Sequence, residues 1–205
     1  LLRRNLDCQL LLFNNEIYGL TKGQYSPTSR IGTRSPSTPF GSVDRPVNPC
    51  SYALGSGARF VARGIDVHKN LVEVLKAAHA HRGASFVEIY QNCVVYNDDV
   101  FAPFTSKEVA ADKQLWLVAG EKMLFAGGTK GLALDMEHHV LKVVDGDSGE
   151  VLVHDPKNRS VAYMLAELPP VGFPVALGVL YEDPAPTFDS AVVEQNEAAA
   201  KGKSA

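Results

Sequence analysis

The chain has 205 residues, 45% of them hydrophobic, and a formal net charge of −3 at pH 7, which allows one sizeable core with or without a small appendage. No apolar run reaches the length of a membrane span, and no basic block offers a surface for nucleic acid, so neither partner is predicted. Three cysteines without a pairing pattern, and a start that is no signal peptide, indicate a cytoplasmic protein in a reducing compartment.

The first predicted element is a buried strand over residues 8–13, an apolar run flanked by polar residues. A buried strand so close to the first residue needs earlier strands beside it, so we expect the chain to be the C-terminal part of a longer polypeptide. Two adjacent amides, Asn14 and Asn15, open a polar loop where this strand ends. Ligands bind at such strand ends in open α/β sheets. Amide and carbonyl oxygens are ligands for Mg²⁺, which also holds diphosphates.

The next elements alternate between helices and strands. Residues 29–48 are rich in Ser, Pro, Gly and Arg and predict an irregular segment. Asn48 and Pro49 begin a helix, residues 59–63 form a strand, a helix from Asp66 ends near Gly83, and residues 85–91 form another strand. This alternation predicts an α/β fold with a mainly parallel sheet and flanking helices. We assign residues 1–104 to this domain.

The composition changes from about Thr105 onwards. A short helix at Ser106, small strands near residues 115–118, 141–145 and 151–155, and a helix that ends before Pro169 are predicted. We expect residues 105–183 to form a small appendage that contacts another subunit. Residues 184–205 are rich in Pro, Ala and Glu, and we expect a disordered tail there.

The loop after the first strand carries a specific resemblance. Residues 14–28 read NNEIYGLTKGQYSPT, which closely resembles the second half of the thiamine-diphosphate motif in β subunits of 2-oxoacid:ferredoxin oxidoreductases, especially the 2-oxoglutarate type. The likeness continues through GARFVAR at residues 57–63 and FVEIYQNC at residues 86–93, and more weakly through residues 174–180. It therefore covers most of the chain and implies a thiamine-diphosphate-binding fold.

The resemblance also implies an activity and partners. Such β subunits act with an α subunit in the oxidative decarboxylation of a 2-oxoacid to an acyl-CoA. Electrons pass through a 4Fe-4S cluster to ferredoxin, and the substrates are a 2-oxoacid and coenzyme A. In this chain the 2-oxoacid is predicted to be 2-oxoglutarate.

The resemblance assigns residues to the thiamine-diphosphate site. In the family, Mg²⁺ is held by an upstream Gly-Asp-Gly motif that is absent from this sequence, by an Asn that matches Asn15, and by the backbone carbonyl that matches Ile17. We expect Asn14, the neighbour of Asn15, to point the other way and to matter less. Catalytic roles beside the reacting carbon are predicted for Leu20 and Lys22, with Lys22 pairing with the distal carboxylate of 2-oxoglutarate. The other residues predicted to contact the cofactor are Tyr18, Gly19, Thr21 and Gln24.

The role of Cys93 distinguishes this oxidoreductase from two alternative functions. By the resemblance, Cys93 at the end of a strand is the last ligand of the 4Fe-4S cluster, and the other ligands lie outside the present residues. Cys8 is expected in the core, and Cys50 has no assigned role. A non-oxidative thiamine-diphosphate lyase or synthase, similar to acetolactate synthase, would share the Asn loop without needing a cluster. A non-catalytic fragment or assembly subunit is the other alternative.

Overall fold

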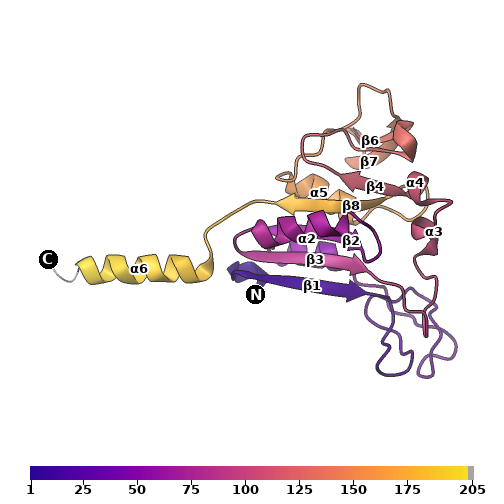
Figure 1. The fold of residues 1–205 in the computed structure, drawn as a ribbon, viewed down its shortest axis with the longest axis horizontal. Coiled ribbons are helices and arrows are strands. Elements are labelled where there is room, and N and C mark those ends of the chain that lie inside the picture. The colour runs from indigo at the N-terminus through magenta and orange to yellow at the C-terminus, as the bar shows by residue number, and fades with distance from the viewer. Residues whose placement is uncertain (203–205) are drawn as a thin grey trace.

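The main body of the protein is a five-stranded sheet in the order β1-β3-β2-β8-β4. The computed structural model describes residues 1–202 (Figure 1). The pairs β1/β3, β3/β2 and β8/β4 are parallel, and β8 runs antiparallel to β2. The mainly parallel α/β sheet predicted from the sequence is therefore present. The strands of this sheet are β1 (Cys8–Asn14), β2 (Phe60–Ile65), β3 (Ala84–Tyr90), β4 (Gln114–Leu117) and β8 (Val175–Glu182).

Helices cover both faces of the sheet. Since strand side chains alternate between faces, Val61 and Phe86 pack in the core beneath α1 (Pro49–Gly55) and α5 (Arg159–Ala166). Phe60 and Val87 point to the opposite face and pack beneath α2 (Leu71–Ala80). The strands β2 and β3 are thus buried on both faces, as their largely apolar sequences indicate.

Asn side chains fix the starts of two helices. Asn48 accepts a hydrogen bond from Ser51 N at 3.1 Å, and Pro49 occupies the first turn of α1, as predicted. Asn158 caps α5 in the same way through Val161 N at 3.1 Å. The capped start of α1 places Asn48 beside the carboxyl ends of the strands β1, β2 and β3.

The strand β1 differs from the buried strand that was predicted. It lies at an edge of the sheet and pairs with β3 alone, so Leu11 is 45% and Phe13 55% exposed. Cys8 is partly exposed and does not lie in the core. The apolar sequence shows that the side chains of this strand are suited to burial. Whether they are buried depends on which other segments pack against the strand.

The predicted appendage of residues 105–183 is only partly separate. A small antiparallel sheet is formed by β5 (Leu124–Phe125), β6 (Lys130–Asp135) and β7 (Val140–Asp145). However, β4 and β8 come from the same region and join the main sheet, so this sheet extends across the predicted division at residue 104. The strand predicted at 151–155 is reduced to a single bridge between Lys122 and Val153. The remaining short elements are η1 (Leu2–Arg4), α3 (Ala102–Thr105), α4 (Ala110–Lys113) and η2 (Ala126–Gly128).

The C-terminal segment forms a helix where a disordered tail was predicted. The helix α6 spans Phe188–Gly202, has no buried residue and projects from the body of the molecule (Figure 1). Its Ala, Glu, Gln and Lys residues are strong helix formers, although their polarity is equally typical of disorder. Residues 203–205, which belong to the same predicted tail, lie outside the described residues. Among residues 1–202, no helix combines the length and hydropathy that crossing a membrane requires.

A buried histidine makes the stability of the body dependent on pH. His154 is 2% exposed, bonds through Nε2 to the carbonyl of Val179 at 2.8 Å, and its Nδ1 has no partner among the described residues. Burial lowers the pKa of His154 below its ordinary value of 6.5. The neutral imidazole therefore stabilises the folded state above pH 6.5, and this contribution is lost as the pH falls below that value.

We expect the free energy of unfolding to fall more steeply between pH 7 and 5 in the wild type than in His154→Gln, which keeps a donor for Val179. Urea denaturation at a series of pH values measures this difference. Parallel pH profiles for the two proteins would show that another group controls the acid lability.

Candidate functional site

The loop of residues 14–28, here called the Asn loop, leaves the sheet at the carboxyl end of β1. Its tip is a tight turn in which Tyr18 N bonds to Gln24 O at 2.7 Å and Gly23 N bonds to Tyr18 O at 3.0 Å. Lys22 and Gly23 both have positive φ, at 62° and 92°. A side chain at Gly23 would be strained by that φ and would approach the ring of Tyr96 to 3.0 Å. Glycine at this position therefore lets the turn close against the next loop.

Two neutral oxygens of the Asn loop are suited to a hard cation. Asn15 Oδ1 accepts a hydrogen bond from Ile17 N at 3.3 Å, which folds the amide over the backbone that leads to the Ile17 carbonyl. Amide and carbonyl oxygens are the kind of ligand that Mg²⁺ takes into its octahedral shell. Residues 1–202 contain no group of three or more His, Cys, Asp or Glu side chains that could complete a metal site. The rest of the shell would have to come from the cofactor, water or other protein.

A second loop, residues 92–100, packs directly against the Asn loop. It follows β3, the neighbour of β1, and Gln91 N bonds to Asn14 O at 3.0 Å where the two strands end. Its first turn is closed by Asn97 N on Cys93 O at 2.9 Å, and Asn97 Nδ2 donates to Asn15 O at 2.9 Å. The turn that carries Cys93 is thus hydrogen-bonded to the residue predicted to bind Mg²⁺.

Of the three cysteines, only Cys93 lies in this region with an accessible thiol. It is partly exposed and unpaired, whereas Cys8 begins β1 at the opposite end of that strand. Cys50 is fully buried, and burial raises the pKa of its thiol well above the ordinary range. Cys50 is therefore an inert thiol at neutral pH.

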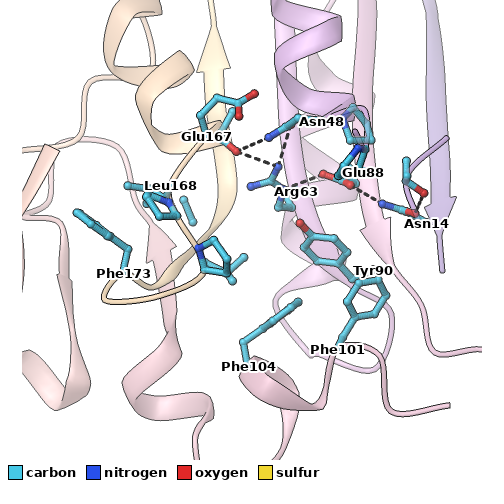
Figure 2. Close-up of a pocket in the computed structure, with 18 of the residues that line it drawn as sticks. Asn14, Asn48, Arg63, Glu88, Tyr90, Phe101, Phe104, Glu167, Leu168 and Phe173 are labelled. Carbon is cyan, nitrogen blue, oxygen red and sulfur yellow. Dashed lines mark hydrogen bonds and ion pairs between the residues drawn. The ribbon is translucent and has the colours of Figure 1, made fainter. Parts of the chain in front are cut away.

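A buried ion pair lies beneath the Asn loop, in the middle of the sheet. Arg63 of β2 and Glu88 of β3 join Nε to Oε2 at 2.8 Å, with side chains 5% and 1% exposed. Asn14 Nδ2 donates to the other oxygen of Glu88 at 2.8 Å, as Figure 2 shows. Sequence reasoning missed this cluster. Its signal was present, because a charged residue interrupts each of the apolar runs FVARGI and ASFVEIY at an interior position.

The ion pair forms one side of a cavity of about 430 Å³, which is large enough for a small molecule. The rings of Tyr90 and Phe101 lie 4.6 Å apart by their centroids, and Phe104 lies 5.2 Å from Tyr90. Leu168 and Phe173, from the loop between α5 and β8, face these rings across the cavity (Figure 2).

Buried groups at this cavity are held in their neutral forms or in ion pairs. Burial raises the pKa of the Tyr90 hydroxyl well above its usual range, so the phenol stays protonated. Burial also raises the pKa of Glu16, an effect opposed by Arg30, whose Nε lies 2.9 Å from Glu16 Oε2. The cavity therefore offers hydrogen-bonding and apolar surface to a ligand.

The structure does not bring all the predicted site residues into one enclosed pocket. Leu20 is 99% exposed and Tyr18 50% exposed, and Thr21 and Lys22 are also exposed. Gly19 and Gln24 are partly buried, and Ile17 is buried. Lys22 makes no ion pair within residues 1–202. A surface built in this way can contribute one wall of a site that another polypeptide segment closes, and the roles of these residues stay predictions.

Asn14 is more constrained than the sequence indicated. It is 6% exposed, and its Oδ1 accepts from Thr28 Oγ1 at 2.7 Å and from Glu16 N at 3.1 Å, in addition to its bond to Glu88. The expectation that Asn14 matters less than Asn15 took no account of these contacts.

Comparison with known proteins gives matches to the same kind of domain. Residues 1–89 match the family model described as the thiamine pyrophosphate enzyme, C-terminal TPP binding domain. Over 97% of its length, the chain is 42% identical to the 2-oxoglutarate oxidoreductase subunit KorB of Mycobacterium tuberculosis, of which it covers 54%. It is 47% identical over 103 residues, half of this chain, to the β subunit of 2-oxoacid:ferredoxin oxidoreductase 1 of Aeropyrum pernix, of which it covers 32%.

A solved structure agrees with these matches. The 2-oxoglutarate:ferredoxin oxidoreductase of Magnetococcus marinus, with 2-oxoglutarate, coenzyme A and succinyl-CoA bound, superposes with a TM-score of 0.69 at 28% identity. The superposition covers 97% of the present chain and 55% of that chain. The chain thus spans about half the length of the Mycobacterium and Magnetococcus proteins, and the predicted thiamine-diphosphate-binding fold is confirmed.

Proposed function

We propose that the chain is part of a 2-oxoacid:ferredoxin oxidoreductase β subunit and that it forms one wall of the thiamine-diphosphate site. In the complete protein, the proposed activity is oxidative decarboxylation of a 2-oxoacid, with 2-oxoglutarate as the preferred substrate, to an acyl-CoA. The observation that carries the proposal is the contact between the Asn loop and the loop of Cys93 through Asn97 and Asn15. It joins the expected cofactor site to a candidate ligand for an electron carrier.

The chain's own residues would hold and orient the cofactor. Asn15 Oδ1 and the carbonyl of Ile17 would supply oxygens to Mg²⁺. The side of the loop formed by Tyr18, Gly19, Thr21 and Gln24 would line the diphosphate and the thiazolium ring. When bound, thiamine diphosphate supplies the electron sink for loss of CO₂. Leu20 and Lys22, exposed in this chain, would face the substrate once the rest of the complex covers them.

Electron transfer would depend on residues outside this chain as well as within it. Cys93 is proposed as one thiolate ligand of a 4Fe-4S cluster, whose other ligands must come from elsewhere. The proposed partners are an α subunit and ferredoxin, with coenzyme A as the acyl acceptor and the cytoplasm as the location. An accessible cysteine beside the Asn loop favours this oxidative class over a lyase or synthase similar to acetolactate synthase, which needs no cluster.

Replacing Asn15 tests the metal site. In the complete β subunit with its partner, Asn15→Ala should raise the Mg²⁺ concentration for half-maximal thiamine-diphosphate binding by about tenfold, because it removes one oxygen from a demanding shell. Isothermal titration at limiting Mg²⁺ measures the change, and excess Mg²⁺ should partly restore binding.

Asn158→Ala is the matched control, since it removes an Asn that only caps α5. It should cost about 1 kcal/mol of stability and leave the Mg²⁺ dependence unchanged. An unaltered titration for Asn15→Ala would assign Asn15 to the turn alone.

A further inference from the structure

The two end residues of the Asn loop and two strand residues beneath it form a hydrogen-bonded cluster, here called the polar anchor: Asn14, Thr28, Arg63 and Glu88. Asn14, Arg63 and Glu88 are 6%, 4% and 1% exposed, and Thr28 is partly buried. The cluster spans the Asn loop and two strands of the sheet. It therefore fixes the loop to the buried strands β2 and β3 of the main sheet.

Nearly every polar atom of the anchor is used. Glu88 Oε1 accepts from Asn14, and Glu88 Oε2 accepts from Arg63 Nε at 2.8 Å and from the Cys50 thiol at 3.4 Å. The guanidinium of Arg63 also reaches Asn48 Oδ1 at 3.4 Å. Removing one member of a buried charged network leaves another without compensation, and this is costly, so the arrangement resists rearrangement.

The anchor acts on the backbone between the two predicted metal ligands. Asn14 Oδ1 accepts from Glu16 N at 3.1 Å, and Glu16 has a left-handed φ of 54°, which is uncommon for a residue with a side chain. The carbonyl of Glu16 accepts a further hydrogen bond from Ser29 Oγ. Residue 16 is thus held in a disfavoured conformation from both sides. Its conformation sets the relative placement of Asn15 and Ile17.

We propose that Asn14 and Glu88 are positioning residues that pre-organise the Asn15 amide and the Ile17 carbonyl for the metal. The inference rests on the proposed function, because it concerns the same Mg²⁺ and diphosphate site. Neither residue has to touch the cofactor. Glu88 acts through Asn14, and Asn14 acts through the backbone of Glu16.

The geometry allows a charge-exchange experiment in the complete β subunit with its partner. In Asn14→Asp, two carboxylates face each other at the position of a 2.8 Å hydrogen bond. In Glu88→Gln, the NH₂ group of the new amide must point either at the Arg63 Nε–H or at the NH₂ group of Asn14. In both orientations two hydrogen-bond donors face each other. In the double variant, the amide introduced in β3 can donate to the carboxylate introduced at the end of β1 and accept from Arg63, so the network is again complete.

Each single variant should raise the Mg²⁺ concentration for half-maximal thiamine-diphosphate binding by about tenfold, the range found for groups that orient metal ligands. The double variant should return to within about threefold of the wild type. In the cofactor-free protein, amide hydrogen exchange at residues 15–24 should be faster in the single variants and restored in the double variant.

Cys50→Ala is the matched control, because it removes a contact to the same carboxylate without touching Asn14. It should leave the Mg²⁺ dependence unchanged. If a single variant does not fold, Thr28→Val replaces it, since valine removes the 2.7 Å bond to Asn14 Oδ1 with little change in shape. A weaker effect in the same direction is expected.

Two results would overturn the inference: a wild-type Mg²⁺ dependence in the folded single variants and in Thr28→Val, or a double variant no better than the worse single one. Failure of the wild-type complex to bind thiamine diphosphate with Mg²⁺ would instead contradict the proposed function itself.

Discussion

In the complete complex, Cys93→Ala is expected to lose cluster iron and ferredoxin reduction while keeping the affinity for thiamine diphosphate. Cys93 would supply a thiolate to the 4Fe-4S cluster, whereas the metal and diphosphate would be held by oxygens of the Asn loop. The two sets of atoms are close but separate, since the contact between the loops runs through Asn97 and Asn15. Iron analysis, the electron paramagnetic resonance signal of the reduced protein and a ferredoxin-reduction assay measure the loss.

Cys8→Ala is the matched control for this experiment. Cys8 is also unpaired and partly exposed, but it begins β1, whereas the Asn loop follows the other end of that strand. The control should keep full iron content and electron transfer. Normal iron content and electron transfer in Cys93→Ala would show that Cys93 is not a ligand of the cluster.

Lys22→Ala is expected to change the substrate preference of the complex. Its kcat/KM for 2-oxoglutarate should fall about ten- to a hundred-fold more than that for 2-oxobutyrate, the range expected for losing a desolvated, charge-assisted hydrogen bond. Of the two substrates, only 2-oxoglutarate carries a distal carboxylate for the ammonium group. Lys22 is exposed and makes no ion pair within residues 1–202, so its charge is free to meet a substrate carboxylate.

Steady-state kinetics on both substrates, with Lys107→Ala as a control at another exposed lysine, separates the possible roles of Lys22. Equal losses on both substrates would assign Lys22 to placing the cofactor or to folding. No loss on either substrate would show that Lys22 remains in solvent and that another group selects the 2-oxoacid.

Local signals in the sequence predicted the first half of the fold well. The strands β2 and β3 lie close to their predicted limits, and Asn48 caps α1 as its position before Pro49 indicates. These elements are specified by apolar runs and caps that act over a few residues. The resemblance carried by residues 14–28 predicted the family, because this string combines glycines, amides and a cation at fixed spacing.

The pairing of strands that are far apart in the sequence was much harder to predict. The strand β8 joins β2 across most of the chain, so no local pattern indicated that residues 175–182 complete the main sheet. The bond between Asn14 and Glu88 is of the same kind: the charge of Glu88 inside an apolar run indicates a buried partner, but the partner is fixed only when β1 pairs with β3. The composition of α6 was ambiguous, since exposed helices and disordered tails draw on the same residues.

The exposed edge of β1 has a consequence for handling this chain in solution. A strand that pairs on one side presents unpaired backbone N–H and C=O groups on the other side. The exposed side chains of Leu11 and Phe13 add apolar surface beside them. Two copies of the chain can align such edges and extend one sheet into another. By itself, the chain therefore has a tendency towards self-association and precipitation.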